Sequence, residues 1–117
     1  MKELDMRNFI EQDRFGKYLG IEITDYSPGN AKARMEINTH HLNSHGYIHG
    51  GAIFSLADAA FAVASNSQGG LALCINASIS FFKSLAGGIL YAEAREISFN
   101  PKLATYLIEI TNESKQP

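Results

Sequence analysis

The spacing of hydrophobic positions changes along the chain from a helical period to an alternating one. The first apolar residues recur every three or four positions, which predicts an amphipathic helix over residues 3–14. Asp13 is expected to cap one further turn that ends at Gly20. Apolar residues then alternate over residues 21–37, on both sides of the turn sequence Pro28-Gly29-Asn30. This alternation around a turn predicts a β-hairpin.

The longest apolar stretch lies in the middle of the chain. Residues from Gly50 to about Ser67 predict one helix of about 17 residues and about 26 Å. Because this helix is apolar nearly all round, we expect it to be buried. Three extended runs follow, at residues 71–83, 88–99 and 103–112. The order of elements predicts an α+β fold in which one antiparallel sheet wraps around one long central helix.

Length and composition indicate one small domain and exclude several classes of protein. The 117 residues show no linker or repeat, so residues 1–117 are expected to form a single domain. The net charge of −2, without clustered basic residues, gives no support to nucleic-acid binding. The single cysteine, Cys74, excludes an internal disulfide framework. The chain shows neither a signal peptide nor a plausible membrane span, so we expect a cytoplasmic oligomer with no membrane contact.

Asp58 is the most unusual residue of the central helix. It stands among leucine and alanine, and no lysine or arginine on the helix can pair with it. A carboxylate there is costly unless it is solvated at a site or hydrogen-bonded. Helical projection places it in one narrow polar stripe, composed of Gly51, Ser55, Asp58, Ala62 and Ser65. The stripe fits a catalytic carboxylate, and the alternative is a solvated groove with a structural aspartate hydrogen-bonded to a loop.

A His-Gly-Gly sequence opens this helix. An unpaired amide at Gly50 or Gly51 can donate a hydrogen bond to a developing oxyanion, assisted by the helix dipole. The alternative is a tight turn that requires glycine. Gly50 and Asp58 lie about 12 Å apart along the helix axis, whereas reacting atoms must approach within about 3–3.5 Å. If both act on one carbonyl, they come from two chains, and a two-fold dimer is expected.

The polar connection over residues 39–49 carries all four histidines. Three of them recur every fourth residue, a spacing that suggests a metal site: His41, His45 and His49. Gly46 and the neighbouring Asn43-Ser44 pair argue against a helix there, so no metal site is expected. His49 is expected to orient the loop or the site. Asn43 is expected either to hold a water or to pin the loop backbone.

The residues after the central helix offer weaker candidates. Phe81 and Phe82 are expected to be strand residues, with at most one of them lining a pocket. Lys83 and Lys102 lie near predicted strand ends, where a lysine meets either substrate phosphates or solvent. Cys74 is expected to be a small core residue.

The loop and the central helix resemble a known family. Three runs carry the resemblance: His41-Leu42-Asn43-Ser44-His45-Gly46-Tyr47-Ile48-His49-Gly50-Gly51, Phe54-Ser55-Leu56-Ala57-Asp58, and Ala64-Ser65-Asn66-Ser67. Together they resemble the hotdog-fold acyl-CoA thioesterases of the phenylacetate-pathway (PaaI-like) type, from about Phe15 to Thr111. The resemblance implies a hotdog fold, a coenzyme A thioester substrate, no other cofactor, and a dimer or dimer of dimers with its active site shared between subunits.

The resemblance also implies a role for each matching residue. Asp58 would activate water or attack directly, Gly50 would supply the polarising amide, and Asn43 and His49 would complete the catalytic site. Substrate contacts are expected from five further residues: Gly51, Ser55, Ser65, Phe82 and Lys83.

The chain departs from the family pattern in two places. The family usually continues beyond the position of Asn112 with one more strand, so the last strand is expected to be missing or truncated. Related thioesterases also place Ser or Thr one turn after the carboxylate, where this chain has Ala62.

The resulting hypothesis is hydrolysis of an aryl-acetyl- or medium-chain acyl-CoA to the free acid and coenzyme A. One alternative is a hotdog dehydratase that acts on 3-hydroxyacyl thioesters by proton abstraction. Another is an acyl-CoA binding module without catalysis.

Overall fold

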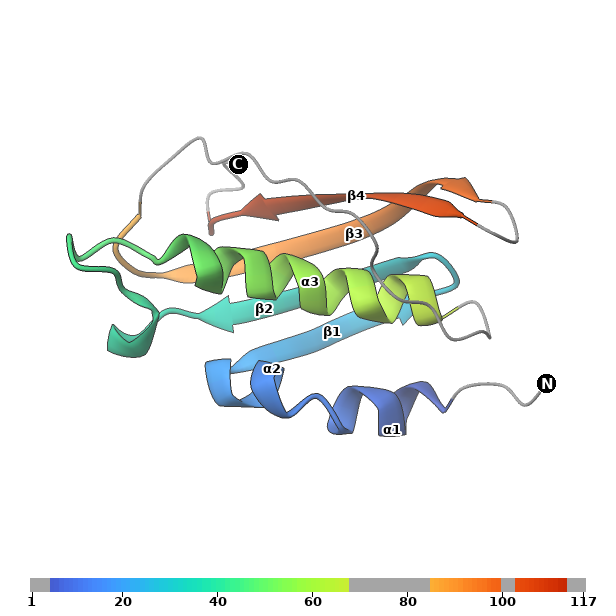
Figure 1. The fold of residues 1–117 in the computed structure, drawn as a ribbon, viewed down its shortest axis with the longest axis horizontal. Coiled ribbons are helices and arrows are strands. Elements are labelled where there is room, and N and C mark those ends of the chain that lie inside the picture. The colour runs from blue at the N-terminus through green and yellow to red at the C-terminus, as the bar shows by residue number, and fades with distance from the viewer. Residues whose placement is uncertain (1–4, 68–84, 100–102, 114–117) are drawn as a thin grey trace.

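The computed structural model describes residues 5–67, 85–99 and 103–113, in which one antiparallel sheet packs against one long helix (Figure 1). The strands follow the order β1-β2-β3-β4, with bounds Ile21–Ser27, Asn30–Glu36, Ile89–Phe99 and Ala104–Thr111. The helix, α3, runs over Gly50–Asn66 and crosses one face of the sheet. The predicted α+β architecture, with its sheet around a central helix, is therefore confirmed.

Alanine predominates in the contact between sheet and helix. Alternate residues of β2 and of β3 as far as residue 94 are buried, as the alternation predicts: Ala31, Ala33, Met35, Leu90, Ala92 and Ala94. The facing side of α3 buries Leu56, Ala60 and Ala64 in the same cluster. Alanine on both sides lets the helix approach the sheet closely, and burial of this apolar area stabilises the fold by about 25 cal/mol per Å².

The bounds of α3 agree with the sequence, but its burial does not. Phe54 keeps 36 % of its surface exposed, and Asp58 is exposed as well, in the part of the chain that the structure describes. The prediction of a helix buried nearly all round is therefore wrong for this chain on its own. A single sheet covers only one side of a helix, so the apolar residues on the other side need a further surface to bury them.

Two short helices begin the chain, and the first is shorter than the one expected over residues 3–14. They are α1 (Met6–Glu11) and α2 (Arg14–Leu19), and residues 3 and 4 lie outside the described part. The break comes at Asp13, whose carboxylate accepts a hydrogen bond from the amide of Gly16 at 2.9 Å and so begins a new helix. The expected cap at Asp13 and the end at Gly20, with φ of 80°, are both confirmed.

The remaining elements agree with the sequence where the structure describes them. The hairpin forms around residues 28–29, and β3 and β4 match the second and third extended runs. The run 71–83, with Cys74 and Phe81, lies outside the described residues, as does the turn at Asn100-Pro101. The polar connection adds one short 3-10 turn, Thr39–His41, which the sequence did not predict. No helix among the described residues is long and apolar enough to cross a membrane.

Candidate active site

In the part of the chain that the structure describes, the first turn of α3 leaves one backbone amide without a partner. His49 is the N-cap residue, and its Nδ1 accepts a hydrogen bond from the amide of Gly51 at 2.8 Å. The amides of Ala52 and Ile53 donate to the His49 carbonyl at 2.9 and 3.2 Å. The amide of Gly50 has no partner within the described residues. Since the helix dipole places partial positive charge here, this amide suits an anionic oxygen.

The hydrogen bond to His49 also sets the tautomer of its ring. Because Nδ1 accepts, the neutral imidazole carries its proton on Nε2. The Nε2–H group is then a second donor beside the Gly50 amide, on an exposed side chain. The expectation that His49 orients the loop is confirmed by its cap, and its contact with substrate stays a prediction.

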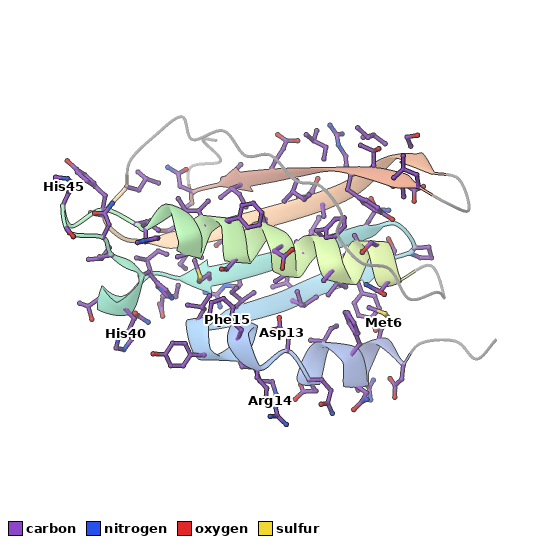
Figure 2. The ribbon with its side chains drawn as sticks, in the orientation of Figure 1. Met6, Asp13, Arg14, Phe15, His40 and His45 are labelled. Carbon is purple, nitrogen blue, oxygen red and sulfur yellow. The ribbon has the colours of Figure 1, made fainter. Side chains whose placement is uncertain are left out.

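His41 anchors the loop to the rest of the fold. Its side chain is 1 % exposed, its Nδ1 accepts from the amide of Asn38 at 3.0 Å, and its Nε2 donates to the carbonyl of Leu19 at 2.7 Å. The His41 carbonyl in turn accepts from the amide of His49 at 2.6 Å. Because both ring nitrogens are hydrogen-bonded, His41 is unavailable as a metal ligand. His40 and His45 both lie at the end of the molecule opposite Met6 (Figure 2). The described residues contain no cluster of three metal-binding side chains.

Asn43 holds the tip of the same loop. Its Oδ1 accepts hydrogen bonds from the amides of His45 and Tyr47 at 2.9 and 3.1 Å. Its backbone amide donates to the Tyr47 carbonyl at 2.7 Å. The structural interpretation of Asn43, a residue that pins the loop backbone, is therefore confirmed. A role in catalysis stays a prediction.

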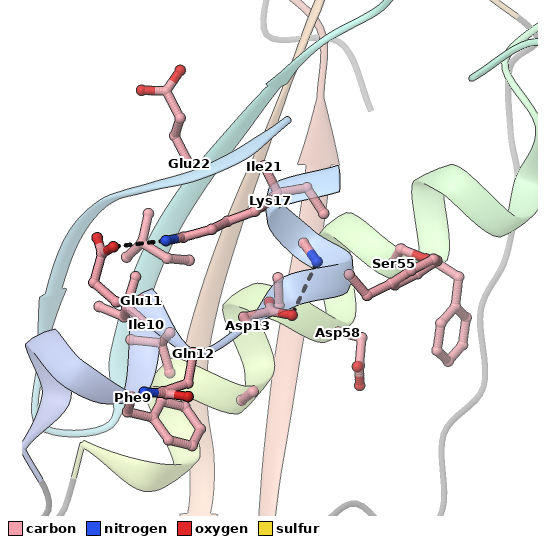
Figure 3. A pocket seen from close by; sticks show the side chains of 17 residues that line it. Phe9, Ile10, Glu11, Gln12, Asp13, Lys17, Ile21, Glu22, Ser55 and Asp58 are labelled. Carbon is pink, nitrogen blue, oxygen red and sulfur yellow. Dashed lines mark hydrogen bonds and ion pairs between the residues drawn. The ribbon is translucent and has the colours of Figure 1, made fainter. Parts of the chain in front are cut away.

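Asp58 lies in the wall of a cavity of about 780 Å³ (Figure 3). Three elements border this cavity: the α1–α2 segment, β1 and the outer side of α3. Two further residues of the predicted polar stripe, Ser55 and Ala62, also line it. The apolar part of the wall comes from Phe9, Ile10, Phe15, Ile21, Ile23, Phe54, Ala59 and Val63.

The carboxyl of Asp58 has no hydrogen-bond or ion-pair partner within the described residues. Partial desolvation beside the cavity wall raises the pKa of Asp58 above its ordinary value although its side chain stays exposed to solvent, and the negative charge of Asp13 raises that pKa further. A higher pKa makes the carboxylate a stronger base near neutral pH. The interpretation of Asp58 as a structural aspartate bonded to a loop finds no support in these contacts.

Asp13 is one of the cavity residues that sequence analysis did not place in a site. Its sequence position predicts a helix cap, and the structure confirms that cap. Only the packing of α2 and β1 beside α3 brings the carboxylate into the cavity wall that holds Asp58 (Figure 3). No pattern in the sequence links the two aspartates.

The other candidate residues are placed as follows. Ser55 donates to the carbonyl of Gly51 at 2.8 Å while lining the cavity. Ser65 lies outside the cavity wall and donates to the carbonyl of Ala62 at 3.3 Å. Phe82 and Lys83 lie outside the described residues. Their roles as substrate contacts stay predictions.

One chain does not bring Gly50 and Asp58 together. Both lie on one continuous helix, which separates them by about 12 Å along its axis. Gly50, His49 and Asn43 do not line the cavity around Asp58. If Gly50 supplies the oxyanion donor and Asp58 the catalytic carboxylate, as the sequence predicts, they are two half-sites, and each would need a complement from outside the described chain.

Comparison with known proteins identifies the family. Residues 45–117 match the thioesterase superfamily. The chain belongs to this family. A putative esterase of Archaeoglobus fulgidus is 44 % identical over 91 % of this chain and 70 % of its own length. The acyl-coenzyme A thioesterase PaaI of Escherichia coli is 39 % identical over 91 % of this chain and 76 % of its own length.

Solved structures agree with this assignment. The structure of E. coli PaaI superimposes with a TM-score of 0.90 at 38 % identity, covering 94 % of this chain and 80 % of that one. A Streptococcus mutans protein bound to acetyl CoA has a TM-score of 0.78 at 28 % identity, covering 82 % of this chain and 78 % of that one. The hotdog fold, the likeness to PaaI and the expectation of a thioester hydrolase are confirmed.

Proposed function

We propose that this thioesterase hydrolyses an aryl-acetyl- or medium-chain acyl-CoA to the free acid and coenzyme A. The observation that carries the proposal is Asp58, a carboxyl in a cavity wall on the helix that begins with the Gly50 amide; neither group has a partner among the described residues. The E. coli relative named as an acyl-coenzyme A thioesterase and the acetyl CoA-bound neighbour support a coenzyme A thioester as the substrate.

The walls of the cavity support the choice of acyl group. Besides the alanines, they present phenylalanine, isoleucine and valine side chains from the α1–α2 segment, β1 and α3. An aromatic or medium-length aliphatic group buries apolar area there, which favours binding by about 25 cal/mol per Å². The volume of about 780 Å³ lies within the usual range of small-molecule sites.

The two half-sites divide the chemistry of thioester cleavage. The Gly50 amide donates to the carbonyl oxygen, where negative charge gathers as the tetrahedral intermediate forms. Asp58 accepts the proton of a water that attacks the carbonyl carbon, or attacks that carbon itself to form an anhydride that water then opens. In both routes the C–S bond breaks, the thiolate of coenzyme A leaves and takes up a proton, and the acid is released.

A dimer unites the two half-sites. Antiparallel packing of two α3 helices about a two-fold axis places the Gly50 amide of one subunit near Asp58 of the other, and symmetry makes two such sites. The exposed side of α3, with Phe54 and Asp58, is the surface that this arrangement covers. Coenzyme A then lies along the subunit boundary with its acyl group beside α3.

Thiol release from a panel of acyl-CoAs of varied length and aromaticity tests the proposed function. We expect free thiol and free acid in equal amounts, with aryl-acetyl or medium-chain acyl groups cleaved fastest. Loss of water from 3-hydroxyacyl-CoA without thiol release would contradict hydrolysis and identify a dehydratase. Stoichiometric binding without turnover across the panel would identify a binding module.

A further inference from the structure

The charged residues of the cavity wall are strongly unbalanced. Four carboxylates line the cavity but only one cation does, among the described residues: Glu11, Asp13, Glu22 and Asp58 face Lys17. They come from all three bordering elements, α1–α2, β1 and α3. The imbalance therefore belongs to the cavity as a whole rather than to one helix.

Two of the four carboxylates are neutralised by partners. Lys17 Nζ lies 2.7 Å from Glu11 Oε2, a contact that lowers the pKa of Glu11, and Arg34 Nη1 lies 2.7 Å from Glu22 Oε1. Asp13 and Asp58 have no such cation within the described residues. The lysine that lines the cavity is thus already paired, and two uncompensated acids remain.

The position of the Asp13 carboxylate is set by the backbone. Its Oδ1 accepts from the Gly16 amide at 2.9 Å, and Gly16 is buried. A Cβ at residue 16 would clash with Asp13 Oδ2, so glycine leaves the room that this carboxylate occupies. In the proposed hydrolysis Asp58 acts as the base or the nucleophile, whereas Asp13 takes part in neither step.

We propose that Asp13 is a specificity-determining residue, which restricts the acyl group to uncharged chains by repelling acyl groups that end in a carboxylate. The inference rests on the proposed function, because it requires the acyl group to enter this cavity. Two negative charges repel each other, and the described part of the cavity wall holds no unpaired cation that would offset this repulsion. Neutral aliphatic and aromatic acyl groups are unaffected by this repulsion.

Two coenzyme A thioesters of equal chain length test the proposal: hexanoyl-CoA and adipoyl-CoA, which differ in a terminal carboxylate. We expect the wild-type protein to prefer hexanoyl-CoA in kcat/KM. Asp13→Asn is expected to reduce that preference by about fivefold, the equivalent of about 1 kcal/mol. Asparagine caps a helix as well as aspartate does, so this variant removes the charge and keeps the cap.

Asp5→Asn is the matched control. Asp5 caps α1 through the amide of Asn8 at 3.2 Å, and it does not line the cavity. The control removes the same charge from the same segment, so its preference for hexanoyl-CoA should equal that of the wild type. An unchanged ratio in Asp13→Asn, or an equal change in Asp5→Asn, would overturn the role of Asp13.

Calorimetric binding of the two thioesters separates this inference from the proposed function. If neither thioester is hydrolysed, the proposed hydrolysis fails, and the affinities of the wild type and Asp13→Asn for the two compounds still report the repulsion. Equal affinities of the wild type for hexanoyl-CoA and adipoyl-CoA would overturn the inference. Hydrolysis of both at equal rates would overturn it while leaving the thioesterase function in place.

Discussion

The start of α3 and its middle differ in how their functional groups are held. At the start, His41, Asn43 and His49 each bond to backbone groups, and together they fix the loop that leads to the Gly50 amide. In the middle, Asp58 has no bonding partner within the described residues and takes its properties from the cavity around it. A backbone donor needs a rigid chain, whereas a proton acceptor needs an environment that keeps its carboxyl unpaired.

Asp58→Asn gives the largest expected effect and tests the middle of the helix. Asparagine cannot accept a proton or attack the thioester, so thiol release should fall by about 10²–10⁴-fold. Thermal melting should show that the variant remains folded, because it places no charge in the cavity wall. Near-normal turnover would show that Asp58 is not catalytic, and that the start and the middle of α3 do not act together on the substrate.

Gly50→Pro tests the start of the helix in the complementary way. Proline lacks the amide hydrogen but is favoured at the first helical position, and His49, with φ −62° and ψ 133°, already has the extended backbone required before proline. Loss of this donor should lower kcat by about 10²–10³-fold. Gly50→Ala keeps the amide and is the control. If both variants are equally active, the amide is not the oxyanion donor.

Mixed dimers of these two variants sharpen the comparison further. A hybrid of one Asp58→Asn and one Gly50→Pro subunit contains one intact shared site and one doubly altered site. Random mixing should therefore restore about one quarter of wild-type activity, because about half of the dimers are hybrids with one of two sites intact. Absence of recovery, with hybrids shown by subunit exchange, would mean that the two groups act within one chain or not together.

The pH dependence of turnover tests the electrostatic side of the comparison. Burial, and then the charge of Asp13, raise the pKa of Asp58, so the carboxylate forms at higher pH than an ordinary aspartate. We expect kcat/KM to rise with pH through this raised pKa and then to level off. If kcat/KM does not fall with decreasing pH until the pKa range of an ordinary aspartate is reached, the proposed dependence on the raised pKa of Asp58 is contradicted.

The same shift has a consequence for stability. The folded protein binds the Asp58 proton more tightly than the unfolded chain does. The contribution of this proton to the free energy of unfolding is therefore fully present at pH values below the unfolded-state pKa. It is lost as pH rises through the higher folded-state pKa. The difference in melting temperature between wild type and Asp58→Asn should therefore change across this window, in favour of the variant at higher pH.

Asn43→Ala gives the smallest expected effect and tests the rigidity of the loop. The substitution removes the acceptor for the amides of His45 and Tyr47, which should lower the free energy of unfolding by about 1–2 kcal/mol. Asn43→Asp keeps an acceptor oxygen and should melt close to the wild type. Thermal unfolding measures both, and equal melting of Asn43→Ala and the wild type would show that the loop is held without this side chain.

The sequence alone determined the order of elements, the bounds of α3 and the buried faces of β2 and β3, because local spacing and turn residues decide them. Asp58 was likewise identifiable, since a carboxylate among alanines stands out without any structure. Two expectations differ from the structure. The first helix ends at Glu11 rather than at residue 14, before the turn that Asp13 was expected to cap, and α3 is not buried all round because one sheet covers only one side of it.

The tertiary structure alone decided which groups surround Asp58. Asp13 and Glu22 lie far from Asp58 in sequence and line the same cavity only because α2 and β1 pack beside α3. It also showed that the Gly51 amide is capped by His49 while the Gly50 amide has no partner in the described ranges, a difference that two adjacent glycines do not reveal. Cavity walls and charge balance depend on contacts between distant segments, and local sequence patterns carry no record of those contacts.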